Sequence, residues 1–461
     1  MNGQILEEKQ DQLKQSLLQK DKSQNFYQDK SELQKTTLPL MFAVGVSNVL
    51  YTNLHSFYPL YIQDNFPQLK ATEFGIILAT FEIANLVTSL FLGVYIGSFK
   101  RKNLIIYSLF VLLAGTLAFV TLTNLQTDDY LLFFWLSILF RVIQGASSSA
   151  IQICAYSFAT NEMSDDKDRY IGYVEIATGL GDMVGPALGG FVFQSSGFVG
   201  TFLAFSAIVF VGAIISIIKI PAMLNKKSTS INLLSNVEET SSINENNDDK
   251  SEGSVISDTY PQVLICLLSA CFAVIFTLYI DCILALHLHS MYGVQHNLLG
   301  IFFLLASITY VIGAPLGSYL STRMHRRYVV FLAFGCMIIQ NTLQGPSYIL
   351  GLPDSLILVV IGVSMIGFCL SLALVPLLSE LIETLEDMDI YEPSQICDMT
   401  ASIFNSMFNL GNLVAPLIAG VLNDNYGYKF TTDFMLVSTV IYCIIFYFTM
   451  IYKQDLKIHS D

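Results

Sequence analysis

The chain has few charged residues for its length. Asp, Glu, Lys and Arg make up 13% of its 461 residues, against about 25% in an average soluble domain. A soluble protein of this size needs a polar surface that this composition cannot supply, whereas a surface that faces lipid needs none. Apolar residues make up 53% of the chain. The composition therefore predicts an integral membrane protein in contact with the lipid bilayer.

Several kinds of functional signal are missing. The sequence holds no Walker loop, GxSxG elbow, HExxH pair or dinucleotide-binding fingerprint, so we expect neither an enzyme nor an ATP-driven pump. A net charge of −14 without a basic face argues against nucleic-acid binding. The eight cysteines form no CxxC pair and are interpreted as apolar core residues. We expect no metal and no cofactor.

The apolar residues are grouped in long runs. The first 37 residues are polar and lack the apolar core of a cleaved signal peptide, whereas a spanning helix needs about 20 largely apolar residues. The sequence predicts an all-α membrane protein with twelve transmembrane helices in two six-helix halves. The predicted parts are a disordered cytoplasmic tail 1–37, an N-terminal half 38–220, a cytoplasmic acidic and polar linker 221–260, a C-terminal half 261–452 and a cytoplasmic tail 453–461.

Basic residues are divided unequally between the segments that connect the spans. With both termini in the cytoplasm, twenty Lys and Arg lie on the cytoplasmic side and two, Lys70 and Lys429, lie on the other side. Only Arg141 lies within a span. The excess of cytoplasmic basic residues predicts a multi-pass protein of an intracellular vesicle membrane or the plasma membrane, with both termini cytoplasmic.

An internal repeat relates the two halves. With an offset of 230 residues, the segment 175–197 aligns with 405–427. The positions with identical residues are Leu180, Gly181, Val184, Pro186, Gly190 and Gly197. Equivalent helices recur six spans later in the same orientation, which is typical of transporters whose halves are parallel repeats.

The most specific motif is GxxxGPxxGG in the fifth span. Small residues on one face let two helices approach closely, and a proline bends the helix. Ordinary close helix packing is the alternative interpretation. The predicted conformational motif comprises Gly181, Gly185, Pro186, Gly189 and Gly190, with Gly411, Pro416 and Gly420 in the repeat.

Ionisable residues inside predicted spans are costly and by default functional. Glu175 and Asp182 are seven residues apart and share a helix face, and Asn405 is the repeat partner of Glu175. One hypothesis is that Glu175 exchanges protons under the control of Arg141; in the alternative, Arg141 serves Glu82 or a helix end. These groups could also be hydrogen-bond clamps between helices. The candidate substrate and proton-coupling residues are Glu82, Arg141, Glu175, Asp182, Asp281, His55, Asn405 and Asn409.

Three motifs resemble those of the major facilitator superfamily. The span-five glycines resemble its antiporter motif, and the segment from Arg141 to Gly145 resembles its RxxQG motif. Gly93, Arg101 and Lys102 fit the superfamily signature between spans two and three, but Gly97 replaces its Asp. The resemblance implies a major facilitator fold, with Gly93, Arg101, Lys102 and Gly145 in conformational roles.

Within that superfamily the chain resembles the vesicular amine and polyamine transporter branch. The residues that carry this likeness are Asp281 to His289, Gly345-Pro346 and Val375-Pro376. The resemblance implies a monomeric transporter that exchanges protons for a small organic cation, an amine or polyamine, by alternating access. Amine transporters of the branch have an acid in the first helix, where this chain offers only Asn48 and Asn53. Two alternatives remain: a proton-linked multidrug or neutral-solute carrier, and a non-transporting, receptor-like member.

Overall fold

The computed structural model describes residues 33–69, 71–221, 224, 252–294, 296–345, 347–386 and 393–452. The predicted tails, except residues 33–37, and most of the linker lie outside these residues. All regular elements of the described part are helical. The helices are α2 (Leu54–Asn65), α3 (Ala71–Tyr95), α4 (Arg101–Ala118), α5 (Tyr130–Ser157) and α6 (Lys167–Lys219), followed by α8 (Glu252–Leu278), α9 (Leu284–Tyr292), α10 (His296–Arg323), α11 (Arg326–Gln344), α12 (Leu356–Glu386), α13 (Pro393–Tyr426) and α14 (Tyr428–Phe446).

Ten of the described helices are long and apolar enough to cross a membrane. The first, Leu33–Tyr58, contains a turn at Asn53 before α2 begins. α6 has 53 residues and combines the predicted fifth and sixth spans. α11, the predicted ninth span, is not among the ten. Each predicted span except the seventh therefore falls on one continuous helical segment, because a chain in lipid must satisfy its backbone groups internally. The predicted seventh span, 261–290, is divided between α8, a 3₁₀ turn at Tyr279–Cys282 and α9.

A glycine marks the same connection in both halves. The backbone of α6 leaves helical geometry at Gly197 (φ 66°, ψ −169°). Gly427 (φ 82°, ψ 171°) lies between α13 and α14, the predicted eleventh and twelfth spans. Positive φ favours glycine, and the two positions are equivalent in the 230-residue repeat. The repeat found in the sequence thus has a matching backbone feature.

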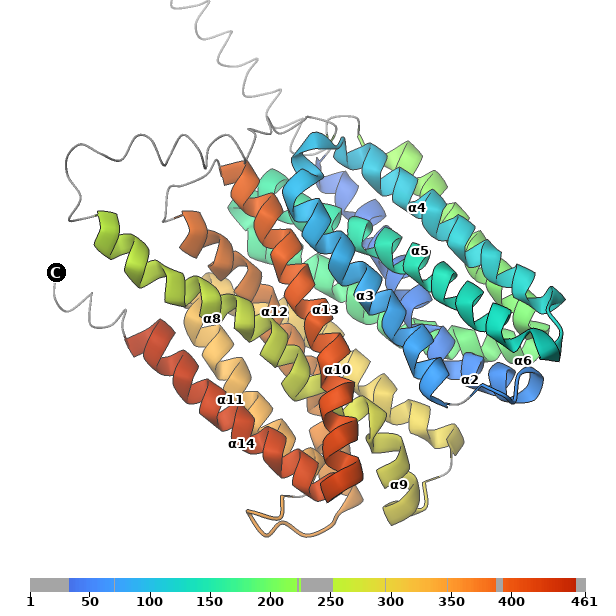
Figure 1. Cartoon of the computed structure of the whole chain (residues 1–461). Coiled ribbons are helices and arrows are strands. Elements are labelled where there is room, and N and C mark those ends of the chain that lie inside the picture. The colour runs from blue at the N-terminus through green and yellow to red at the C-terminus, as the bar shows by residue number, and fades with distance from the viewer. Residues whose placement is uncertain are drawn as a thin grey trace, which may run out of the picture.

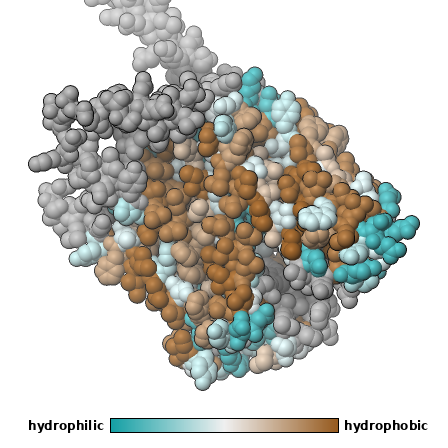
Figure 2. Space-filling view, viewed as in Figure 1, coloured by the Kyte–Doolittle hydropathy of each residue, from teal (hydrophilic) through white to brown (hydrophobic). Residues whose placement is uncertain are grey.

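The two halves meet along two pairs of helices. α6 of the N-terminal half packs against α10, and α3 packs against α13. Figure 1 shows the orange α13 lying beside the blue α3 where the halves adjoin. We call these pairs the α6–α10 crossing and the α3–α13 crossing. Apolar side chains cover much of the flank visible in Figure 2, as expected of a surface that faces lipid.

Candidate functional site

The span-five glycines bring span one and α6 into backbone contact. A Cβ added at Gly181 would lie 2.6 Å from the Gly45 carbonyl oxygen, and one added at Gly189 would lie 2.7 Å from that of Asn53. At Gly185 it would lie 2.8 Å from the Val49 carbonyl oxygen. Real side chains do not approach this closely, so these three positions need glycine.

The other motif glycines differ in how closely they are packed. A Cβ at Gly190 would have its nearest neighbour, Ser56, at 3.8 Å, and at Gly420 nothing lies within 4 Å. At Gly411 it would be 2.7 Å from Val274 Cβ, and at Gly93 it would be 3.0 Å from Ser402 Cβ. Gly145 has a similar close approach, to the Phe81 carbonyl oxygen. Two of the predicted motif glycines, Gly190 and Gly420, are therefore not explained by close packing.

Glu175 is a buried acid at the α6–α10 crossing. The Tyr156 hydroxyl, from α5 of the same half, donates a hydrogen bond to Glu175 Oε1 over 2.5 Å. The Tyr310 hydroxyl, from α10 of the opposite half, donates to Oε2. Gly179 makes room for the Tyr310 ring, because a Cβ there would lie 3.2 Å from Tyr310 Cγ. The Glu175 carboxylate thus binds one tyrosine from each half, and the bond from Tyr310 joins the halves.

Arg141 is fully buried, and its guanidinium binds the backbone of the first span. Its guanidinium donates to the carbonyl oxygens of Leu50 (3.3 Å) and Tyr51 (3.2 Å) and to Gln144 Oε1 (3.1 Å). It also lies 4.5 Å from the centroid of the Phe81 ring. The two carbonyls precede the turn at Asn53, where backbone acceptors commonly lack helical partners. In this conformation Arg141 binds a helix end, as the alternative interpretation expected, and no ion pair joins it to Glu175 in the described part of the chain.

Two further acids lie near Tyr51 of span one. Glu82 is buried, with 5% of its surface exposed, and hydrogen-bonds Tyr51. Arg141 interacts electrostatically with it. Asp182 is half-buried and lies near both Tyr51 and Tyr310. Acidic groups from α3 and α6 are therefore grouped around span one and the α6–α10 crossing.

The equivalent positions at the α3–α13 crossing carry amides. Asn405 Nδ2 donates to Asn85 Oδ1 over 3.2 Å, and Asn409 Nδ2 donates to the Asn405 carbonyl oxygen over 2.7 Å. The hydroxyls of Ser89 and Ser406 lie 2.6 Å apart across the same crossing. At these positions the crossing is held by neutral hydrogen bonds. The side chains of the two remaining candidates, His55 and Asp281, lie outside the described part of the structure.

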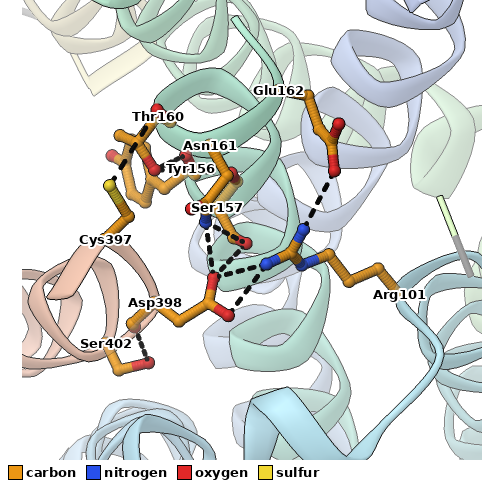
Figure 3. A network of polar contacts seen from close by, with 9 residues as sticks. All are labelled: Arg101, Tyr156, Ser157, Thr160, Asn161, Glu162, Cys397, Asp398 and Ser402. Atoms are coloured by element: carbon orange, nitrogen blue, oxygen red, sulfur yellow. Dashed lines mark hydrogen bonds and ion pairs between the residues drawn. The ribbon is translucent and has the colours of Figure 1, made fainter. Parts of the chain in front are cut away.

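A buried ion pair joins the halves at one end of the α3–α13 crossing (Figure 3). Arg101 Nη2, at the start of α4, lies 2.8 Å from Asp398 Oδ2 on α13. Asp398 also accepts hydrogen bonds from Ser157 and from Asn161 Nδ2, the latter over 2.8 Å. Glu162 holds Arg101 from the other side at 3.2 Å. Two opposite charges in this geometry stabilise contact between the halves, and we call the Arg101–Asp398 pair gate one.

A second group of ion pairs lies at the α6–α10 crossing. Arg326, at the start of α11, is 2.8 Å from Asp168 Oδ2 at the start of α6 and 2.5 Å from Glu383 on α12. Lys167 is 3.2 Å from Glu383. We call the Arg326–Asp168 pair, with Glu383, gate two. Both gates involve the helix ends that the charge distribution predicts to be cytoplasmic.

Sequence reasoning named Arg101 but neither gate aspartate. Asp168 and Asp398 are separated by the same 230 residues as the repeat, and this offset was the signal that could have found them. The signature residue Lys102 does not join the gates: its ammonium donates to the Ile217 carbonyl oxygen over 3.1 Å. Arg101 is thus the signature residue that crosses between the halves.

Comparisons with known proteins agree with this architecture. The sequence model of the Major Facilitator Superfamily matches residues 40–386. The human MFS-type transporter SLC18B1 is 24% identical over 391 residues, which cover 83% of this chain and 79% of that protein. Multidrug resistance protein 2 of Bacillus subtilis is 28% identical over 150 residues, 32% of this chain and 35% of that protein. A bacterial homologue of the iron transporter ferroportin, crystallised in an outward-facing state, superposes with a TM-score of 0.66 at 11% identity, over 91% of this chain and 99% of that chain.

Proposed function

Because this chain belongs to the major facilitator superfamily, whose members carry small molecules across membranes, we propose that it exchanges protons for a small organic cation. An amine or polyamine is the substrate class that the sequence resemblance favours. The observation that carries the proposal is the set of acids Glu82, Glu175 and Asp182, buried or half-buried in the membrane-spanning region. Acids in such a place attract cations and can carry protons.

The gates support a rocking mechanism. Gate one and gate two join the halves at one end of the crossings, so both must break for that end to open. Glu175 joins the halves further along α6, through Tyr310. A cation that binds Glu175 competes with tyrosine hydroxyls for the same oxygens, and this gives the substrate a way to loosen the crossing. Alternating access then follows from rocking of the halves about the site.

Localisation and assembly remain part of the proposal. The twenty-to-two division of basic residues supports cytoplasmic termini, a cytoplasmic linker and a cytoplasmic position for both gates. An intracellular vesicle membrane and the plasma membrane both fit. We propose a monomer, because each six-helix half packs against the other half of the same chain.

A transport screen in proteoliposomes with an imposed pH gradient tests the proposal. We expect accumulation of at least one aliphatic amine or polyamine, abolished by a proton ionophore. Glu175→Gln should bind and exchange substrate across the membrane but fail to concentrate it. Uptake that is indifferent to the pH gradient and to organic cations would contradict the proposal.

A multidrug carrier is the second candidate. The match to Multidrug resistance protein 2 of Bacillus subtilis over 150 residues favours it. The same screen separates the candidates, since bulky aromatic cations and neutral drugs would be carried without competition by polyamines. A non-transporting member should instead keep its function when Arg141 and Glu175 are neutralised together.

A further inference from the structure

One short segment of the N-terminal half contacts both Glu175 and gate one. Tyr156 donates its hydroxyl hydrogen bond to Glu175 over 2.5 Å. The next residue, Ser157, donates to Asp398, and Asn161, one turn further, donates to the same carboxylate over 2.8 Å. Figure 3 shows these side chains on one helical segment, with Asp398 approaching from α13. A displacement of this segment changes contacts at both places.

The segment changes its helical type directly after Ser157, before Asn161. Residues Phe158–Glu162 form a π-helical turn directly after α5. A π turn holds one residue more than an α turn, is rare, and is frequently found at functional sites. Conversion to an α turn would shift the chain that follows by about 1.5 Å along the axis and about 100° around it. That shift would move Asn161 and Glu162 away from gate one.

The other half lacks this arrangement in its described residues. α12, which corresponds to α5, remains α-helical to Glu386. It contributes Glu383 to gate two, where Glu383 pairs with Arg326 and Lys167, without a π turn in its described residues. The position equivalent to Glu175 is an amide, Asn405. The link between a central acid and a gate is thus present on one side of the repeat.

We propose that Tyr156 is a positioning residue that couples the occupancy of Glu175 to the state of gate one. While Tyr156 is bound to Glu175, Ser157 and Asn161 are held against Asp398 and the gate stays closed. When a cation takes the Glu175 carboxylate, Tyr156 is released, the π turn relaxes and Asp398 loses two donors. The proposed function supplies the identity of that cation, but the coupling rests on hydrogen bonds within the chain.

A natural cysteine can report the state of gate one. Cys397 is buried next to Asp398, and its thiol lies 3.9 Å from the Thr160 carbonyl oxygen. In the full-length chain with the other seven of its eight cysteines replaced by Ala, the rate of labelling by a membrane-impermeant maleimide from the gate side measures opening. Ser402→Cys, with Cys397 also replaced by Ala, gives a second reporter at a buried position of α13.

The test compares two tyrosine-to-phenylalanine variants. Tyr156→Phe removes the donor but keeps the ring that packs edge-on against Phe404 at 5.9 Å. We expect it to raise the labelling rate about three- to tenfold, the shift that one lost hydrogen bond can produce. Tyr58→Phe is the matched control, because Tyr58 makes a buried hydrogen bond to Ser137 (2.7 Å) in the same half, and it should leave the rate unchanged. Both variants must reach the membrane at the wild-type level and elute as a single species.

A double variant tests whether Tyr156 acts through its neighbour. If it does, Tyr156→Phe with Ser157→Ala should open gate one no further than the stronger single variant. Multiplied effects, or a wild-type labelling rate for Tyr156→Phe at both reporters, would overturn the coupling. Transport is not measured in this experiment. A chain that carried no organic cation would still show the coupling, and a failed coupling would leave the proposed substrate to its own transport assay.

Discussion

The two crossings between the halves share a plan at their gated ends. At the α6–α10 crossing Arg326 binds Asp168, and at the α3–α13 crossing Arg101 binds Asp398. In each gate an arginine at the start of one span reaches an aspartate at the start of a span in the opposite half. Rocking about a pseudo-twofold axis breaks both pairs together, so the duplication of the gates suits a symmetric movement.

The centres of the same crossings differ. Glu175 accepts a hydrogen bond from Tyr310, whereas its repeat partner Asn405 donates one to Asn85 over 3.2 Å. The parts that open and close are therefore duplicated, but the group that can carry charge occurs at one crossing. Under the proposed function, movement and coupling are therefore separable properties of the repeat, and each should be alterable without the other.

The largest effect on transport is expected at Gly185, where the side chain differs in size between the two copies of the repeat. Gly185→Leu should abolish transport while the protein remains inserted in the membrane, because overpacking costs about 1–3 kcal/mol and blocks movement of α6 against span one. Its repeat partner, Ala415, is a residue with a side chain. Gly190→Ala is the control, since its Cβ would have 3.8 Å of space. Substrate uptake by the two variants, normalised to membrane protein, decides the matter, and normal uptake by Gly185→Leu would refute the role of this contact.

The second-largest effect is expected in the coupling of substrate accumulation to the pH gradient. Glu175→Gln should lose accumulation driven by a pH gradient by at least about tenfold, equivalent to about 1.4 kcal/mol, and keep exchange of labelled for unlabelled substrate. Adding Asn405→Asp to that variant places an acid at the other crossing and should not restore accumulation. Restoration would mean that either crossing can hold the coupling acid, and wild-type accumulation by Glu175→Gln alone would make it a packing residue.

A smaller difference is expected between the two gates, in how far the gated end opens when the aspartate of each is replaced. The side chains of Arg101 and Asp398 are 8% and 4% exposed, against 17% and 9% for Arg326 and Asp168. When the aspartate is lost, Arg326 keeps Glu383 at 2.5 Å, whereas Arg101 keeps Glu162 at the longer distance of 3.2 Å. Breaking a buried pair costs about 3–5 kcal/mol, so Asp398→Asn should open the gated end more than Asp168→Asn, as measured by cysteine labelling from that side. Exchange of the partners, Arg101→Asp with Asp398→Arg, should recover part of the loss. Equal opening by the two Asn variants would remove the distinction between the gates.

The smallest effect is expected in the segment that connects the halves. Ser242→Cys, in a chain without other cysteines, should transport like its cysteine-free parent. An impermeant thiol reagent should label it from the side of the gates alone, as the division of basic residues predicts. Labelling from the opposite side would reverse the orientation of both gates.

Sequence patterns were sufficient for the spans and for the close contacts of span five. Long apolar runs must be helical in lipid, and glycines spaced four apart must share a face. The turn at Asn53, which supplies acceptors to Arg141, was not predictable. A carbonyl oxygen carries no side-chain signature, so the sequence left Glu175, Glu82 and a helix end as alternative partners of Arg141.

The tyrosines and aspartates of the site were missed for a different reason. Tyr156 and Tyr310 are ordinary residues for a membrane span, and only the fold brings both hydroxyls to Glu175. Asp168 and Asp398 look like surface charges near span ends. Their roles depend on which helices of the opposite half they face, and apolar periodicity does not contain that information.

The glycine turns at Gly197 and Gly427 have a practical consequence for anyone handling the protein. Each joins two long helices through one or very few non-helical residues. The connection therefore contains no loop that a protease could cleave or an antibody could bind. Epitope tags are tolerated where exposed chain has slack, and these two connections have none. A tag inserted after Gly197 would force apart helices that are continuous in the backbone, and the same insertion after Gly427 would repeat the damage in the second half.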